Sequence, residues 1–145
     1  MRFNDFYIGQ VIEAGPYTLI EPELNAFAQR YDPQWFHTDT SAAQGGPYGG
    51  IIASGWQTCA IAMRLSVDSI YKNSNAIGSP GVSYLKWPAA VRAGDILRLK
   101  TTVLETRFSK QRADRGILRT HWELKNQNDI AVLNLEAISF FDLTR

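Results

Sequence analysis

The sequence predicts an α+β domain in which one antiparallel sheet curls around a long helix. Helical patterns occupy the first half of the chain, whereas strand patterns follow one another from Gly78 onward without intervening helices. The longest helix is apolar on nearly every side, so other parts of the fold must bury it. Because 145 residues are enough for one core and short for two, we expect a single domain over residues 1–145.

The first helix is predicted in the stretch "PYTLIEPELNAFAQRYD". Pro22 suits the first turn of a helix, and the apolar residues after it recur at the spacing of one helical face. These residues are Leu24, Phe27, Ala28 and Tyr31. The Asp32-Pro33 pair should end this helix, because a residue before proline is disfavoured in the α conformation.

A short helix and a glycine-rich turn are predicted next. "TDTSAAQ" can form one or two helical turns, with Thr38 or Asp39 as the N-cap. "GGPYGG" follows, with four glycines in six residues. There the backbone must turn tightly or approach another group closely.

The longest helix is predicted from Ser54 to Tyr71. One of its faces is apolar and consists of Trp56, Ala60, Met63, Val67 and Ile70. Apolar residues on its other faces are Cys59, Ile61 and Leu65. A helix with apolar groups nearly all round is a buried one, and Cys59 is then a small buried residue.

Four strands are predicted in the second half of the chain. Their sequences are "GVSYLKW", "DILRLKTTVLETRF", "GILRTHWELKN" and "IAVLNLEAISFFDL", all rich in β-branched and aromatic residues. The turn signals "RAGD" and "NQND" separate strands by short links, which favours antiparallel pairing. The sheet and the long helix can bury each other if the sheet curls around the helix.

Composition and charge exclude several classes of partner. The formal net charge of +1 gives no overall attraction to nucleic acid or to an anionic membrane. No apolar stretch approaches the roughly 18 residues that a membrane span needs, and the polar N-terminus lacks the apolar segment of a signal peptide. Cys59 is the only cysteine, which excludes an internal disulfide. We expect a soluble cytoplasmic protein.

The segment "YDPQWFHTD" holds the best candidates for chemistry. Asp32 and His37 lie between two predicted helices, where a carboxylate and an imidazole that share one water would form an acid–base pair. The intervening Trp35 and Phe36 would exclude bulk water. Both residues of the pair could instead be ordinary loop residues. A metal site lacks a clear third ligand, and His121 in a predicted strand is interpreted as structural.

A second element could stabilise an oxyanion. At the start of the long helix, the backbone N–H groups near Ser54 and Gly55 are first-turn donors at the positive end of the helix dipole. Gly55 has no side chain, so a ligand carbonyl could approach its N–H closely.

These residues lie in stretches that resemble the MaoC-like dehydratase family, relatives of the (R)-specific enoyl-CoA hydratases. The stretches are "FAQRYDPQWFHTDTSAAQGGPYGGIIASGWQT", "GSPGVSYLKWPAAVRAGDIL" and "SKQRADRGILR". The resemblance implies a hotdog fold, a dimer and a 2-enoyl-CoA substrate, with no cofactor besides the CoA of the substrate. It also implies that Asp32 and His37 hold the catalytic water and that the Gly55 N–H polarises the thioester carbonyl.

The sequence departs from the family pattern around the aspartate. Tyr31 stands where the pattern has glycine, and Gln34-Trp35 replace Asn-Pro. Gln34 is a longer side chain that can still form hydrogen bonds in the site, and Trp35 adds bulk near the expected acyl pocket.

A cluster of cations offers a site for the CoA phosphates. It comprises Arg107, Lys110, Arg112, Arg115 and Arg119, opposed by Glu105 and Asp114. A solvated hairpin loop is an equal interpretation. Two other functions remain open: a non-catalytic acyl-CoA-binding subunit and a hotdog thioesterase, which would release free thiol.

Overall fold

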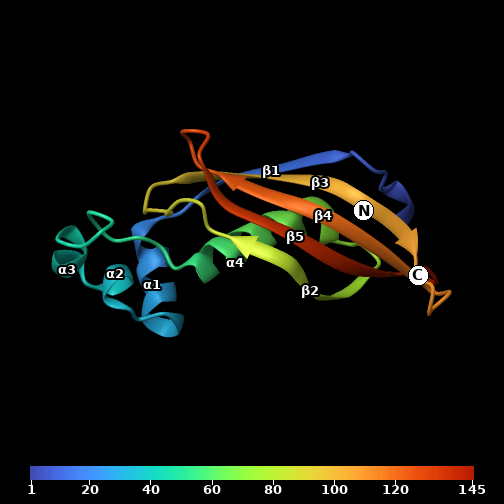
Figure 1. Ribbon diagram of the computed structural model, residues 1–145, viewed down its shortest axis with the longest axis horizontal. Coiled ribbons are helices and arrows are strands. Elements are labelled where there is room, and N and C mark those ends of the chain that lie inside the picture. The colour runs from blue at the N-terminus through green and yellow to red at the C-terminus, as the bar shows by residue number, and fades with distance from the viewer.

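A five-stranded antiparallel sheet curls over one long helix in the computed structural model, which describes all 145 residues (Figure 1). The strands are β1 (Val11–Thr18), β2 (Ala76–Lys86), β3 (Ile96–Phe108), β4 (Arg115–Lys125) and β5 (Ala131–Asp142). The α-helices are α1 (Glu21–Tyr31), α2 (Trp35–Thr38), α3 (Thr40–Gln44) and α4 (Gly55–Ser66). A 3-10 turn covers Phe3–Asp5, and a π-helical segment over Val67–Tyr71 continues α4. No helix is both long enough and apolar enough to cross a membrane.

The strand order in the sheet is β1-β3-β4-β5-β2, so β1 and β2 form the two edges. In β4 the side chains alternate between buried and half-buried along the whole strand, as expected for a sheet with one face on the core. The main core joins buried residues of α4 to buried residues of the three central strands, and a second, smaller cluster includes Phe3, Phe6 and Phe141. The predicted antiparallel sheet around a long helix is therefore confirmed.

The helix α4 is only partly buried, which corrects the prediction from its sequence. Its buried face carries Ile61, Ala62 and Leu65, which pack into the core beneath the sheet. The predicted apolar face is divided: Trp56 is 61% and Met63 is 45% exposed, whereas Ile70 of the same face is buried, at 1%. The prediction was wrong because apolar residues on all sides of a helix do not show which side its own sheet covers.

Two strands differ from the predictions. β1 was not predicted, because Gly15-Pro16 interrupts its apolar alternation, and a register shift between Ala14 and Tyr17 lies at the same place. β2 begins at Ala76, earlier than the predicted stretch, and register shifts interrupt its pairing with β5. Glycine and proline hide both strands in the sequence, because they are depleted from regular strands.

The segment between α1 and α4 is more regular than predicted. α1 ends at Tyr31 with Asp32 as its C-cap, and Asp39 caps α3 by accepting a hydrogen bond from the Ala42 N–H, both as expected. The intervening residues form the one-turn helix α2 rather than an irregular loop. In the glycine-rich turn, a Cβ on Gly46 would lie 2.8 Å from the Trp35 ring, so this turn does approach another group closely.

Candidate active site

Asp32 and His37 meet at the junction of α1, α2 and the start of α4. The Nε2 atom of His37 lies 3.2 Å from Oδ2 of Asp32, and the two side chains are 5% and 17% exposed. The end of α1 and the single turn of α2 bring together two residues that are five positions apart. The structure thus places the predicted pair in contact and largely shields it from solvent.

The Asp32 carboxylate accepts two further hydrogen bonds. The Gln34 amide donates to Oδ1 at 2.7 Å, and the Ser54 hydroxyl donates to Oδ2 at 2.7 Å. Burial acts to raise the pKa of Asp32, but the bonds from Gln34 and Ser54 and the nearby His37 outweigh it and lower the pKa. The carboxylate is therefore ionised near neutral pH, and both hydrogen bonds fix its orientation.

The proton positions on His37 follow from its second contact. Nδ1 lies 2.7 Å from the carbonyl oxygen of Ile52, which can only accept, so Nδ1 carries a proton. Nε2 then faces the Asp32 carboxylate, and two bare acceptors at 3.2 Å would repel each other. A proton that moves onto the pair can therefore lie between Nε2 and Oδ2, where either atom can accept it. The pair can accept a proton at the carboxylate and release one from the imidazole.

The backbone N–H of Gly55, the first residue of α4, donates to no protein group. It lies in the first turn of a 12-residue helix, where such donors lack intrahelical partners and the helix dipole favours negative charge. The next N–H, of Trp56, is satisfied by the Ser54 hydroxyl at 3.3 Å. The structure leaves the Gly55 N–H available to an oxygen in the same cleft as Asp32 and His37.

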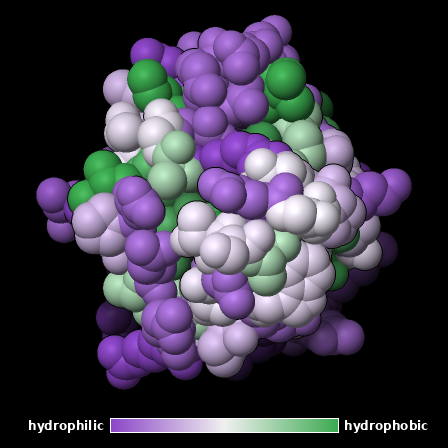
Figure 2. All heavy atoms as spheres, turned by 90° about the vertical axis from the view of Figure 1, so that its left-hand side faces the viewer, coloured by the Kyte–Doolittle hydropathy of each residue, from purple (hydrophilic) through white to green (hydrophobic).

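These groups line a cleft of about 450 Å³. Apart from the pair, Gln34 and Gly55, its wall is formed by Phe36, Tyr48, Ile52, Ala53, Trp56, Thr58 and the segment 87–91. Phe36 lies edge-on to the His37 ring, with a centroid distance of 4.4 Å. Figure 2 views the molecule from the end that carries α2 and α3, where hydrophilic side chains surround a paler central area.

Trp35 does not line this cleft, contrary to the expectation of bulk near an acyl pocket. Its ring packs on Gly46 outside the cleft. The bulky side chain that does line the cleft is Trp87, directly after β2. Sequence reasoning missed Trp87, although its position before Pro88 indicated that a strand ends there.

The predicted phosphate-binding cluster lies elsewhere. Arg107, Lys110, Arg112 and Arg115 lie in or beside the turn from β3 to β4, at the end of the molecule opposite α2 and α3 (Figure 1). Arg107 pairs with Glu105 at 3.0 Å, and Arg112 pairs with Asp114 at 2.9 Å. This hairpin therefore does not line the cleft of Asp32 and His37.

Other candidate residues lie outside the cleft. His121 is in the middle of β4, opposite Thr102 and Glu136 of the neighbouring strands. Cys59 is half-buried rather than fully buried, and burial raises the pKa of its thiol, which disfavours the reactive thiolate. No three histidine, cysteine, aspartate or glutamate side chains are grouped so that they could hold a metal ion.

Comparison with known proteins identifies the family. The model of the MaoC-like domain family matches residues 5–121. The chain belongs to this family. The crystal structure of a MaoC-like dehydratase from Rhodospirillum rubrum is 36% identical, with a TM-score of 0.89 over 96% of this chain and 94% of that one. The predicted hotdog fold and the predicted family are confirmed.

Other similar proteins share less sequence identity with this chain. The 3-hydroxyacyl-thioester dehydratase Z of Mycobacterium tuberculosis is 32% identical over 60% of this chain and 59% of its own length. The uncharacterized protein YdeM of Bacillus subtilis is 29% identical over 94% of this chain and 95% of its own length. The R-hydratase PhaJ1 of Pseudomonas aeruginosa shares the fold, with a TM-score of 0.76 over 97% of this chain and 84% of that one at 22% identity.

Proposed function

We propose that this MaoC-like protein reversibly adds water across the double bond of a 2-enoyl-CoA thioester. One observation carries the proposal: the Asp32–His37 pair shares a cleft with the free N–H of Gly55. Such a cleft offers an acid–base pair and an oxyanion donor, the two elements that hydration of a conjugated thioester requires. Family membership supports the same reaction class.

In the proposed reaction, Asp32 and His37 hold a water beside the double bond. The Asp32 carboxylate takes one proton as the water oxygen bonds to Cβ, and the electrons of the double bond move toward the thioester oxygen. The pair then delivers a proton to Cα, and the thioester carbonyl forms again. Because one pair both holds the water and delivers the proton, the hydroxyl and the proton add to the same face.

The proposed role of Gly55 is to stabilise the charge on the thioester oxygen. Its N–H is unpaired in the protein, so no internal bond must break before it donates to substrate. A single donor of this kind typically contributes about 3–4 kcal/mol to lowering the barrier. Ser54 and Gln34, expected from the sequence to contact substrate, bond to the Asp32 carboxylate and are proposed to position it.

The acyl chain has an apolar space available next to the cleft. A cavity of about 620 Å³ lies between α4 and the strands β2, β4 and β5, and most of its lining is hydrophobic. It shares Trp56 with the cleft. The proposed chemistry uses only side chains and one backbone N–H, so the CoA of the substrate is the single cofactor group that we propose.

We further propose that the protein is a homodimer that pairs through β2. This strand bonds only to β5, and nearly all of its residues are exposed. An edge strand with free backbone groups favours pairing with another chain. Val82 on β2 lines the apolar cavity together with Trp56 and Met63 of α4, and all three side chains are exposed, as is Ile77 on the same strand. Sedimentation equilibrium should give twice the 16.3 kDa chain mass, and a Val82→Asp variant should sediment as a monomer; a monomeric wild type would refute the dimer.

The proposed function is tested by the loss of the conjugated-thioester absorbance of crotonyl-CoA. Asp32→Asn and His37→Ala should each lower kcat by about 10²–10⁴-fold. His121→Ala is the matched control, because it removes the other histidine, which lies outside the cleft, and should retain wild-type turnover. A free-thiol assay runs alongside. Thiol release would identify a thioesterase, and thermal stabilisation by CoA thioesters without turnover would identify a binding subunit.

A further inference from the structure

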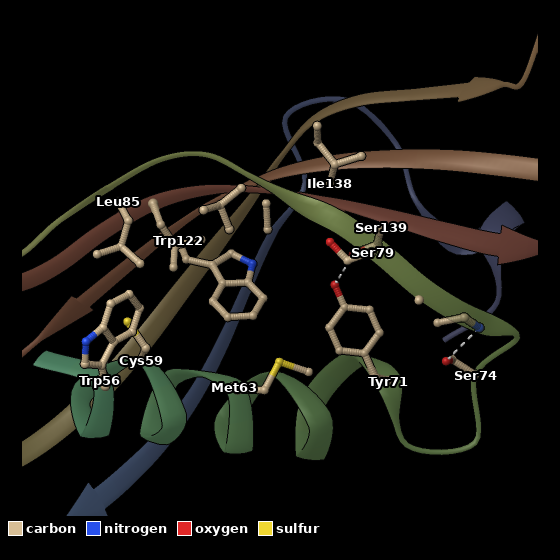
Figure 3. Close-up of a pocket in the computed structure, with 15 residues that line it drawn as sticks. Trp56, Cys59, Met63, Tyr71, Ser74, Ser79, Leu85, Trp122, Ile138 and Ser139 are labelled. Atoms are coloured by element: carbon tan, nitrogen blue, oxygen red, sulfur yellow. Dashed lines mark hydrogen bonds between the residues drawn. The ribbon is translucent and has the colours of Figure 1, made fainter. Parts of the chain in front are cut away.

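Two tryptophan rings stand between the catalytic cleft and the apolar cavity. The cleft holds Asp32, His37 and Gly55, and the cavity extends from Trp56 along α4 to Tyr71. In Figure 3, Trp56 and Cys59 rise from α4 at one end of this cavity, beneath Leu85, while Tyr71 reaches Ser139 at the other end. The end marked by Trp56 is the end next to Gly55.

The Trp87 ring, which follows β2, lies at the end of the apolar cavity that is next to the cleft. A Cβ on Gly55 would lie 2.5 Å from the Trp87 ring, so the indole packs directly against the first residue of α4. The Cys59 thiol, which lines the apolar cavity, lies beside the same indole. The ring therefore contacts Gly55 on the cleft side and Cys59 on the cavity side.

The Trp56 ring packs against Trp87 at the same place. Its ring meets Trp87 edge-on, with centroids 5.2 Å apart and planes at 85°, which is a favoured aromatic geometry. Trp56 lines both spaces, whereas Trp87 lines the cleft alone. Trp87 is 42% exposed, so the rest of its own chain covers only part of the ring.

We propose that Trp56 and Trp87 form an aromatic partition that sets the length of acyl chain the enzyme accepts, with Trp87 as the determining residue. This inference rests on the proposed function. A short acyl group fits inside the cleft, but each carbon of a longer chain must enter the apolar cavity, and it can do so only after the Trp87 ring has moved. The wild-type protein therefore favours short 2-enoyl chains.

The partition is tested by calorimetric binding of saturated acyl-CoA esters with four to twelve carbons, which need no turnover. In the wild type the Kd should stop falling once the chain reaches the partition. In Trp87→Ala each added methylene should continue to tighten binding by about fourfold, the effect of burying one CH₂. Trp87→Phe has a smaller ring that keeps the packing on Gly55, so it should extend the chain-length limit by less than Trp87→Ala. It still tests the partition if the alanine variant does not fold.

Trp35→Leu is the matched control, because Trp35 is exposed to a similar degree and packs outside both spaces. It should keep the wild-type chain-length profile. Parallel profiles in the wild type and both Trp87 variants would overturn the partition, as would a wild type that binds long chains as tightly as Trp87→Ala. Hydration of crotonyl-CoA is measured separately, so a protein that binds the esters without hydrating them refutes the proposed reaction and still decides the partition.

Discussion

Replacing Ser54 by alanine should destabilise the protein and also remove a hydrogen bond that positions Asp32, the proposed base. The Ser54 hydroxyl donates to Asp32 at 2.7 Å and accepts from the Trp56 N–H at 3.3 Å, and the residue is fully buried. A hydrogen bond to a charged group contributes about 1.5–3 kcal/mol. Loss of an N-cap costs about 1 kcal/mol. Ser54→Ala should therefore lower the free energy of unfolding by about 2.5–4 kcal/mol.

Urea unfolding of the wild type, Ser54→Ala, Asp32→Asn and the double variant separates the two contributions. Because Asp32→Asn leaves a neutral acceptor, the two substitutions should couple by about 1 kcal/mol or more. Additivity within about 0.5 kcal/mol would refute the claim that the hydroxyl stabilises the charged carboxylate. The cap contribution should remain in both backgrounds.

The loss of stability caused by Ser54→Ala should depend on pH in a defined direction. The folded pKa of Asp32 lies below its ordinary value of 3.8, so its ionisation stabilises the fold above pH 3.8. That contribution is lost as the pH falls through the folded pKa. The stability difference between the wild type and Ser54→Ala should therefore narrow below about pH 3.8. A constant difference across this range would contradict the assignment.

Two further predictions concern packing and the acid side of the pH profile. Gly46→Ala should lower the free energy of unfolding by about 1 kcal/mol, the low end of overpacking costs, because its Cβ would lie 2.8 Å from the outer edge of the Trp35 ring, which is 45% exposed. Gly45→Ala, whose Cβ would have its nearest neighbour at 3.8 Å, should change the urea midpoint little. Gln34→Ala removes a bond that favours the Asp32 carboxylate, so the pH at which turnover falls to half on the acid side should move upward; an unchanged or lower value would contradict the role of Gln34.

Much of the fold was predictable because its signals are local. The alternation in β4 and the apolar residues of α4 follow directly from the pleat of a strand and the turn of a helix. β1 was missed because Gly15-Pro16 breaks its pattern within eight residues. The exposed face of α4 could not be predicted, since the side on which the sheet packs depends on contacts between distant parts of the chain.

The candidate site was predictable only in part. The spacing of Asp32 and His37 suggested a pair, and the structure brings them into contact. Their partners were hidden because they lie far along the chain: Ser54 is 22 positions from Asp32, and the Ile52 carbonyl is 15 positions from His37. Trp87 gave even less signal, because a tryptophan after a strand is also an ordinary surface residue.

The two segments of the site hold each other in place. The Ile52 N–H donates to the Phe36 carbonyl at 3.2 Å, and the Ile52 carbonyl accepts from His37. Both backbone groups of Ile52 are therefore bonded to residues of α2. Two residues further on, the Ser54 hydroxyl donates a hydrogen bond to Asp32 and caps α4, the helix that begins with Gly55. The bonds from Ser54 and to Ile52 therefore link the acid–base pair to the segment that begins α4.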